Sequence, residues 1–246
     1  TAGGDLDTTF GGDGYVDVPG LPGTPAPERN YEVLASALDS QGRILVAGSC
    51  NLCPANVDRD AWVLRLLADG TPDPGFGAGG WAIFDPTGGE DDAVELEVDA
   101  SDRVLVRGWG TVPGTQPYVA RLAVNGALDG GWGAGGVSLL SPTDIGYSPE
   151  AMAWDPATGG VVLAHSAATV NGRPTGLARV TGAGLYDPDF GDAGFVDLSI
   201  YDEGTYLYDV KLQSDGKIVA VGRIDGNGAQ LGGFFLARTL ADGTLD

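Results

Sequence analysis

The chain has 246 residues, 34 acidic against 13 basic side chains and a net charge of −21. A chain of this length can bury a sizeable core, and 43% hydrophobic residues exclude a disordered acidic polymer. The charge argues against nucleic acid and anionic membrane surfaces as partners, and no run of about 18 apolar residues predicts membrane insertion.

Short β-type runs follow one another along the whole chain, separated by Gly, Pro and Asp. They are rich in Val, Leu, Ile and aromatic residues, which is typical of strands, and no segment shows a helical period over ten residues. The runs form four groups of four: residues 15–18, 31–38, 43–48 and 61–67; 81–84, 93–98, 103–108 and 118–124; 137–140, 151–155, 160–165 and 176–180; 195–198, 206–212, 217–222 and 233–240.

A motif of an aromatic residue followed by Gly-x-x-Gly accompanies each group. It begins at Phe10, Phe76, Trp132 and Phe190, so the copies start 66, 56 and 58 residues apart. An Asp lies three residues before each aromatic: Asp7, Asp73, Asp129 and Asp187. An Arg precedes the last three of these Asp residues by eight positions, and Arg238 precedes Asp246 in the same way: Arg65, Arg121, Arg179 and Arg238. A period near 57 residues indicates a repeat architecture.

The repeats predict an all-β fold: a β-propeller of four blades, each with four antiparallel strands. We expect one domain over residues 1–246, with repeats at approximately 6–67, 68–124, 125–182 and 183–246. Residues 241–246 match 68–73, and residues 5–10 supply the end of such a connection, so the two ends could join to close a ring. Half of a larger ring completed by a second chain, or a piece of a longer array, are the alternatives.

The paired motif in residues 65–77, with the strand and turn in residues 212–222, resembles the delta-60 repeat proteins. The resemblance covers nearly the whole chain. The third repeat departs most, with Asp155-Pro156-Ala157-Thr158-Gly159-Gly160 at its hairpin and His165 where the other repeats have Gly. The resemblance implies an exported or surface-attached bacterial protein with a propeller-like fold, and it implies no defined reaction or ligand.

Residues that recur in every repeat are expected to be structural. Each Arg should pair with its Asp, because burying an unpaired charge is costly. The aromatic residues should fill the seam between blades, and the motif glycines should adopt positive φ. The alternative role is calcium binding by oxygen ligands in Gly-rich turns, which no helix-loop-helix calcium motif supports: Asp69, Asp73, Asn125, Asp129, Asp187 and Asp242.

Cys50 and Cys53 form a C-x-x-C pair, and His165 is the single His. A four-ligand zinc site of Cys and His cannot be built from them. We therefore expect a local disulfide, which would place the protein outside the cytoplasm, with a targeting segment removed before Thr1.

The loops on one face of the propeller differ between repeats, so they are the expected place for function. These loops span residues 19–30, 49–60, 85–92, 109–117, 141–149, 166–174, 199–205 and 223–232. Trp109 is the leading candidate, since an aromatic side chain past a strand end can stack on a sugar or anchor a protein. The further candidate binding residues are Arg59, Asp60, Tyr147, Arg173, Tyr201, Arg223 and Asp225.

The sequence favours a secreted or cell-surface binding or scaffold module for a glycan or protein partner, as a monomer or small homo-oligomer. It offers no nucleophile, zinc or phosphate-binding motif, and no catalytic or metal-binding residue is assigned. The alternative is a glycan-acting hydrolase with Glu90, Asp91 or Asp92 as acid and base. His165 has no evident nucleophile beside it and is expected to be packed or exposed without a role. No cofactor is predicted apart from the alternative of calcium.

Overall fold

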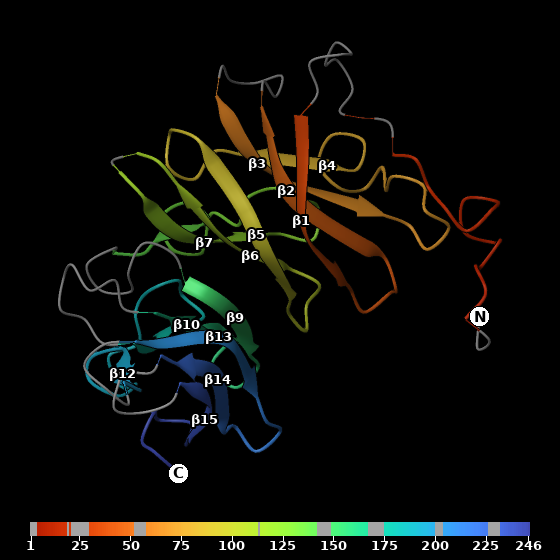
Figure 1. The fold of residues 1–246 in the computed structure, drawn as a ribbon. Helices are drawn as coiled ribbons and strands as arrows, with labels where there is room; N and C mark the ends of the chain where they lie inside the picture. Colours follow the sequence, from red (N-terminus) through yellow and green to blue (C-terminus); the bar gives the residue numbers. More distant parts are fainter. Residues whose placement is uncertain are drawn as a thin grey trace.

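The computed structural model describes residues 4–18, 20, 30–51, 58–112, 114–141, 149–166, 175–199, 204–225 and 232–246. In these residues the chain is all-β, with strands in four antiparallel sheets and no helix (Figure 1). The predicted fold class is confirmed. The described part of the fourth sheet has three strands, where the repeats predicted four.

Each sheet is a meander of consecutive antiparallel strands. Sheet 1 contains β1 (Asn30–Leu38), β2 (Ile44–Asn51), β3 (Arg59–Leu66) and β4 (Trp81–Phe84). Sheet 2 contains β5 (Asp91–Val98), β6 (Val104–Gly110), β7 (Gln116–Leu122) and β8 (Val137–Leu139). Sheet 3 contains β9 (Pro149–Asp155), β10 (Gly160–His165), β11 (Gly176–Val180) and β12 (Phe195–Asp197). Sheet 4 contains β13 (Thr205–Leu212), β14 (Ile218–Ile224) and β15 (Gly233–Thr239).

The sheets are out of phase with the repeats. The run at residues 81–84, grouped with the second repeat, pairs with β3 and completes sheet 1, and β8 and β12 complete sheets 2 and 3 in the same way. The grouping of these runs was therefore wrong by one strand. The physical reason is the turn after β3, which brings the chain straight back against that strand. Residues 15–18 pair with no strand in the described part of the chain.

The recurring Arg and Asp hold that turn together, as predicted. Arg65 Nε donates to Asp73 at 2.8 Å, and Arg121 and Arg179 do the same to their Asp residues at 3.0 and 2.7 Å. The backbone N–H of Asp73 donates to the carbonyl of Arg65, which closes the turn. Each Arg–Asp pair thus joins two residues that are eight positions apart in the sequence, and this pairing needs no contact with another sheet.

Apolar side chains between consecutive sheets form the core. Phe76, Trp132 and Phe190 are fully buried, and an Arg guanidinium lies 4.5 to 5.5 Å from each ring centre. Phe10 is half-buried. Three of the four predicted seam aromatics are therefore confirmed as buried plugs. The motif glycines adopt positive φ as expected, for example Gly77 at 50°.

A small and a large residue face each other across the second and third strands of every sheet. Gly48 lies opposite Trp62, and Gly108 opposite Tyr118. In sheet 3 the order is reversed, because His165 lies opposite Gly176. His165 is buried, with its ring edge-on to Phe195 at 6.5 Å. The third repeat therefore differs at this position because the large and the small residue have changed places between the two strands.

The four sheets pack in chain order along an arc. Figure 1 shows sheet 1 and sheet 4 at opposite ends, with residues 4–18 on the side of sheet 1 and the C-terminus beside sheet 4. Contacts between sheets join β1 to β5, β5 to β9 and β9 to β13. Among the described residues, the expected closure of four blades into one ring is therefore not seen. Closure would need contacts between sheet 1 and sheet 4, and outward-facing apolar residues of sheet 4 are exposed instead.

Candidate functional site

Two sets of loops that differ between repeats meet at one end of the sheets. In sheet 2, the backbone N–H of Glu90 donates to Thr111 Oγ1 at 3.1 Å, which ties the loop before β5 to the loop after β6. In sheet 4, the N–H of Asp225 donates to the carbonyl of Gly204 at 2.7 Å. The described parts of these loops therefore share the non-repetitive face, as the sequence predicted.

Arg59 ties sheet 1 to sheet 2 at this face. It begins β3, its Nε donates to Ser49 Oγ at 2.9 Å, and its Nη2 contacts Glu32. The same nitrogen lies 2.6 Å from Asp92 Oδ1 of β5. One guanidinium thus joins two acidic residues from neighbouring sheets. Asp60, predicted beside it as a binding residue, is buried within β3 and is not accessible.

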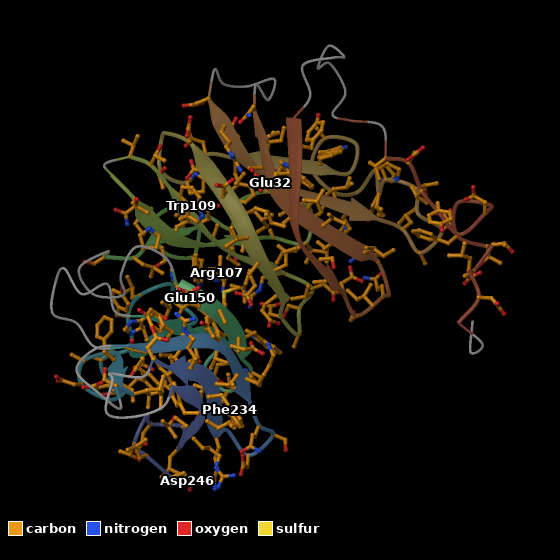
Figure 2. All side chains as sticks on the ribbon, in the orientation of Figure 1. Glu32, Arg107, Trp109, Glu150, Phe234 and Asp246 are labelled. Atoms are coloured by element: carbon orange, nitrogen blue, oxygen red, sulfur yellow. The ribbon has the colours of Figure 1, made fainter. Side chains whose placement is uncertain are left out.

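Trp109 lies in the same sheet as Asp92, the acidic member of this ion pair. It is half-buried near the end of β6, and its cross-strand partner in β5 is Asp92. Asp92 therefore links two sequence-predicted residues, because it lies opposite Trp109 in the strand register and forms an ion pair with Arg59. Figure 2 shows Trp109 and Glu32 at the same end of sheets 1 and 2. We call the group of Glu32, Arg59, Asp92 and Trp109 the loop-face cluster.

A second polar group lies on sheet 4. Arg223 stacks with its Cζ atom 4.7 Å from the centre of the Tyr206 ring, and its Nε lies 3.2 Å from Asp225 Oδ1. Both charged side chains are about half exposed. The predicted residues Arg223 and Asp225 are therefore partners, on a different sheet from the loop-face cluster. The remaining predicted residues lie outside the described residues: Tyr147, Arg173 and Tyr201.

The carboxylates considered for hydrolysis are largely engaged. Asp91 is fully buried and accepts a hydrogen bond from Thr87 Oγ1 at 2.9 Å, while Asp92 is held by Arg59. Burial raises the pKa of Asp91 to about 7, and the nearby Asp85 carboxyl adds to the rise. Glu90 is exposed. Of the three, a single carboxylate is thus open to solvent.

The raised pKa of Asp91 predicts a pH-dependent effect of Asp91→Asn. Between about pH 4, where an unfolded Asp ionises, and pH 7, the native state binds more protons than the unfolded state, so stability is lost as the pH rises. The Asn variant avoids this loss. Its gain in unfolding free energy should be larger at pH 8 than at pH 5 by up to about 3 kcal/mol.

Urea denaturation at the two pH values measures this difference. Glu90→Gln is the matched control, because it removes an exposed carboxyl next to Asp91 in the chain. An equal effect of Asp91→Asn at both pH values would contradict the prediction.

Sequence reasoning missed a second charged link between sheets. Arg107 of β6 donates to Glu95 at 2.6 Å and to the carbonyls of Pro149 and Glu150 in β9. Figure 2 shows Arg107 and Glu150 side by side where sheets 2 and 3 meet. A signal was present: Arg107 occupies the position that Ala47 has in sheet 1, facing the next sheet. Burial raises the pKa of Glu150.

The carboxylates proposed as calcium ligands take part in turns and ion pairs. Thr71 donates its N–H and hydroxyl to Asp69 at 2.9 and 2.6 Å, and Thr244 does the same to Asp242. Asp73, Asp129 and Asp187 bind the recurring Arg residues. Among the described residues, no three His, Cys, Asp or Glu side chains gather as a metal site would require. Calcium binding stays an alternative prediction of the sequence.

Cys50 is buried at the end of β2, with its Sγ 3.8 Å from the carbonyl oxygen of Asp60. Cys53 lies outside the described residues. The disulfide between them stays a prediction.

Within the described ranges, no helix has the length and hydropathy of a membrane span.

Comparison with known proteins supports a propeller-like family. The model of a family described as a domain of unknown function (DUF5122) beta-propeller matches residues 40–76 and 213–246. The first stretch runs from the hairpin after β1 through the turn after β3, and the second from the hairpin after β13 to Asp246. No curated protein matches the chain.

Among solved structures, the chain is similar to a proposed exo-beta-1,3-galactanase from Bifidobacterium bifidum s17. The two are 9% identical with a TM-score of 0.43, over 91% of this chain and 73% of the other. This distance is too great to bear on activity.

The family match falls on the recurring hairpin, Arg and Asp, which are the residues that shape each blade. Together with four antiparallel sheets packed face to face in chain order, it supports a β-propeller-like fold for the chain.

Proposed function

We propose that this protein is a binding module that recognises a glycan through its non-repetitive loop face. The observation that carries the proposal is the loop-face cluster. There a half-buried Trp109 lies opposite Asp92 in the register of β5 and β6, and Asp92 forms an ion pair with Arg59. An aromatic ring can stack on the apolar face of a sugar, and carboxylate and guanidinium groups can bind its hydroxyls.

The residues that recur in every blade support this division of roles. The buried Arg residues and their Asp partners bind each other and close the turns after the third strands, so they are not free for a ligand. One position in the second strand, near the loop face, holds a different residue in each of three sheets: Ser49, Trp109 and Arg223. In each case it follows by two residues a side chain that faces the next sheet. Differences among otherwise equivalent units are where individual binding properties can arise.

The hydrolase alternative is less well supported by this geometry. An acid and base pair needs two carboxyls placed on either side of a bond. Asp91 is fully buried, and Asp92 is ion-paired with Arg59. Glu90 is exposed, but neither Asp91 nor Asp92 is available as the second catalytic carboxyl. The absence of product from a panel of polysaccharides would fit the binding role, and turnover lost in Glu90→Gln would favour the enzyme.

The proposal includes a location outside the cytoplasm. It rests on the resemblance of residues 65–77 and 212–222 to delta-60 repeat proteins and on the predicted Cys50–Cys53 disulfide. A carbohydrate of a cell surface or matrix is the partner chemistry that such a location offers.

A glycan array probed with labelled protein tests the proposal, with and without calcium. Selective binding should fall at least about tenfold in Trp109→Ala, the usual effect of removing a central aromatic contact. Leu185→Ala is the control, because it removes an exposed apolar side chain from the opposite, repetitive end of the sheets.

A blank array under both conditions would contradict glycan recognition and shift the search to a protein partner. Binding that is unchanged in Trp109→Ala would place the ligand away from the loop-face cluster. Binding that is lost on chelation would assign calcium a role in it.

A further inference from the structure

The outer face of sheet 4 is an uncovered copy of an interface that the molecule forms three times. Leu236 lies two residues before Arg238, as Val63, Val119 and Leu177 lie before their Arg residues. Those three side chains are 0% exposed because the next sheet covers them, whereas Leu236 is 65% exposed. Phe234, on the same face, is 80% exposed, and Figure 2 labels it on sheet 4. Sheet 4 therefore presents a blade surface with no blade against it.

Arg238, among the described residues, also lacks one hydrogen bond that the other three recurring Arg residues make. In the first three sheets, Nη1 of the recurring Arg donates to a turn carbonyl of the following sheet. Arg65, for example, donates to Val124 at 2.6 Å. Arg238 keeps its partner Asp246 but has, in the described part of the chain, no turn carbonyl of a following sheet. Its side chain is about half exposed.

The N-terminal segment is the complementary half of that interface. The N–H of Gly11 donates to the carbonyl of Asp69 at 3.3 Å. The same bond docks the fourth-strand segment of each of the first three sheets on the next sheet, as from Gly77 to Asn125 at 2.8 Å. Residues 7–18 thus rest on sheet 1 as the last strand segment of a blade that would precede it. Sheet 4 is the sheet whose described residues lack that strand.

We propose that the outer face of sheet 4 binds a second copy of this chain, head to tail. Residues 15–18 of one copy would pair with β15 of the other and supply its fourth strand. Arg238 would then reach the turn carbonyl of Ala68 of the partner subunit, the equivalent of Val124. Used twice, this heterologous contact closes two arcs into a ring of eight blades.

A second copy fits better than closure of one chain on itself. The N-terminal segment is already docked on its own sheet 1, and sheet 1 and sheet 4 stand at opposite ends of the arc (Figure 1). A second copy offers the preformed segment together with sheet 1, so no sheet has to move. The three internal interfaces show that this sequence pattern forms a buried apolar contact of this type.

The internal registers predict which residues would pair. Val63 lies opposite Ala82, and Leu177 opposite Val196. The same register places Leu236 opposite Val16 of the partner subunit. The double variant Val16→Cys with Leu236→Cys should therefore cross-link on mild oxidation.

Non-reducing electrophoresis of the oxidised double variant, beside the wild-type chain, distinguishes the occupants. A covalent dimer supports the proposal. A compact cross-linked monomer overturns it in favour of closure within one chain. No cross-link overturns the pairing of residues 15–18 with β15.

Sedimentation between about 1 and 100 μM supplies the second test, the range in which moderate self-association is seen. Wild-type protein should sediment as a dimer at the upper end, and Leu236→Asp as a monomer. Leu185→Asp is the matched control, since Leu185 is also 65% exposed but lies in a repetitive turn, and it should remain dimeric. A monomeric wild type at all concentrations, or equal behaviour of the two variants, overturns the proposal.

Discussion

Arg179→Met should lower the free energy of unfolding by about 3–5 kcal/mol, because it leaves the carboxylate of Asp187 without its cation in a buried turn. Arg179 is 7% exposed, and its Nε donates to Asp187 at 2.7 Å. Its guanidinium also stacks on Phe190 and binds the carbonyl of Ala241 in the next sheet. One side chain therefore closes a turn and joins two blades.

Urea denaturation followed by tryptophan fluorescence measures the loss. Lys211→Met is the control, because it breaks the exposed ion pair with Asp209, and such pairs contribute less than about 1 kcal/mol. Adding Asp187→Asn to Arg179→Met should recover part of the loss, since the unpaired charge is then removed. Equal losses for Arg179→Met and Lys211→Met would show that the buried pair does not hold the blade together.

Gly108→Ala should destabilise the protein by about 2–4 kcal/mol, through overpacking of a closed strand pair. A Cβ atom at Gly108 would lie 2.1 Å from the carbonyl oxygen of Asp92 and 2.4 Å from the Tyr118 ring. Neither neighbour can easily retreat. The Tyr118 hydroxyl donates to that same carbonyl at 2.9 Å, and Asp92 is bound to Arg59.

Gly130→Ala is the matched control, and its effect should have the opposite sign. A Cβ atom there meets nothing within 4 Å, and the equivalent positions hold Pro74 and Pro188. Loss of chain entropy in the unfolded state should then stabilise the protein by about 0.4–1 kcal/mol. The same denaturation measurement compares the two variants. A neutral Gly108→Ala would mean that β5 can move away from β6.

The pair of His165 and Gly176, which replaces such a Gly–aromatic pair in sheet 3, shows what comparison of the repeats can detect. The sequence identified His165 as the residue that replaces a recurring Gly, but not that Gly176 opposite it makes the space. The exchange is visible only once the register of β10 and β11 is known. A signal is present in the sequence, because the third strands of the other sheets have Trp62, Tyr118 and Phe235 where sheet 3 has Gly176.

The candidate site was only partly predictable for a related reason. Trp109 and Arg59 were recognised as residues in loops that differ between repeats. Glu32 and Asp92, which bind Arg59, come from β1 and β5, on either side of the first seam. Arg107 and its contacts across the second seam were missed altogether. Such contacts depend on how two sheets are placed against each other, and no short spacing encodes that placement.

The sequence by itself determined the strands, the four-fold repeat, the Arg–Asp turns and the aromatic plugs. The reason is that these features arise from contacts within about ten residues or from alternation along a strand. Tertiary structure alone decided that Trp81–Phe84 joins sheet 1, that Asp91 is buried, and that sheet 4 is left with Leu236 exposed. These outcomes depend on how each sheet packs on the next. That packing is decided by many side-chain contacts over the whole face of a sheet, and no single motif specifies it.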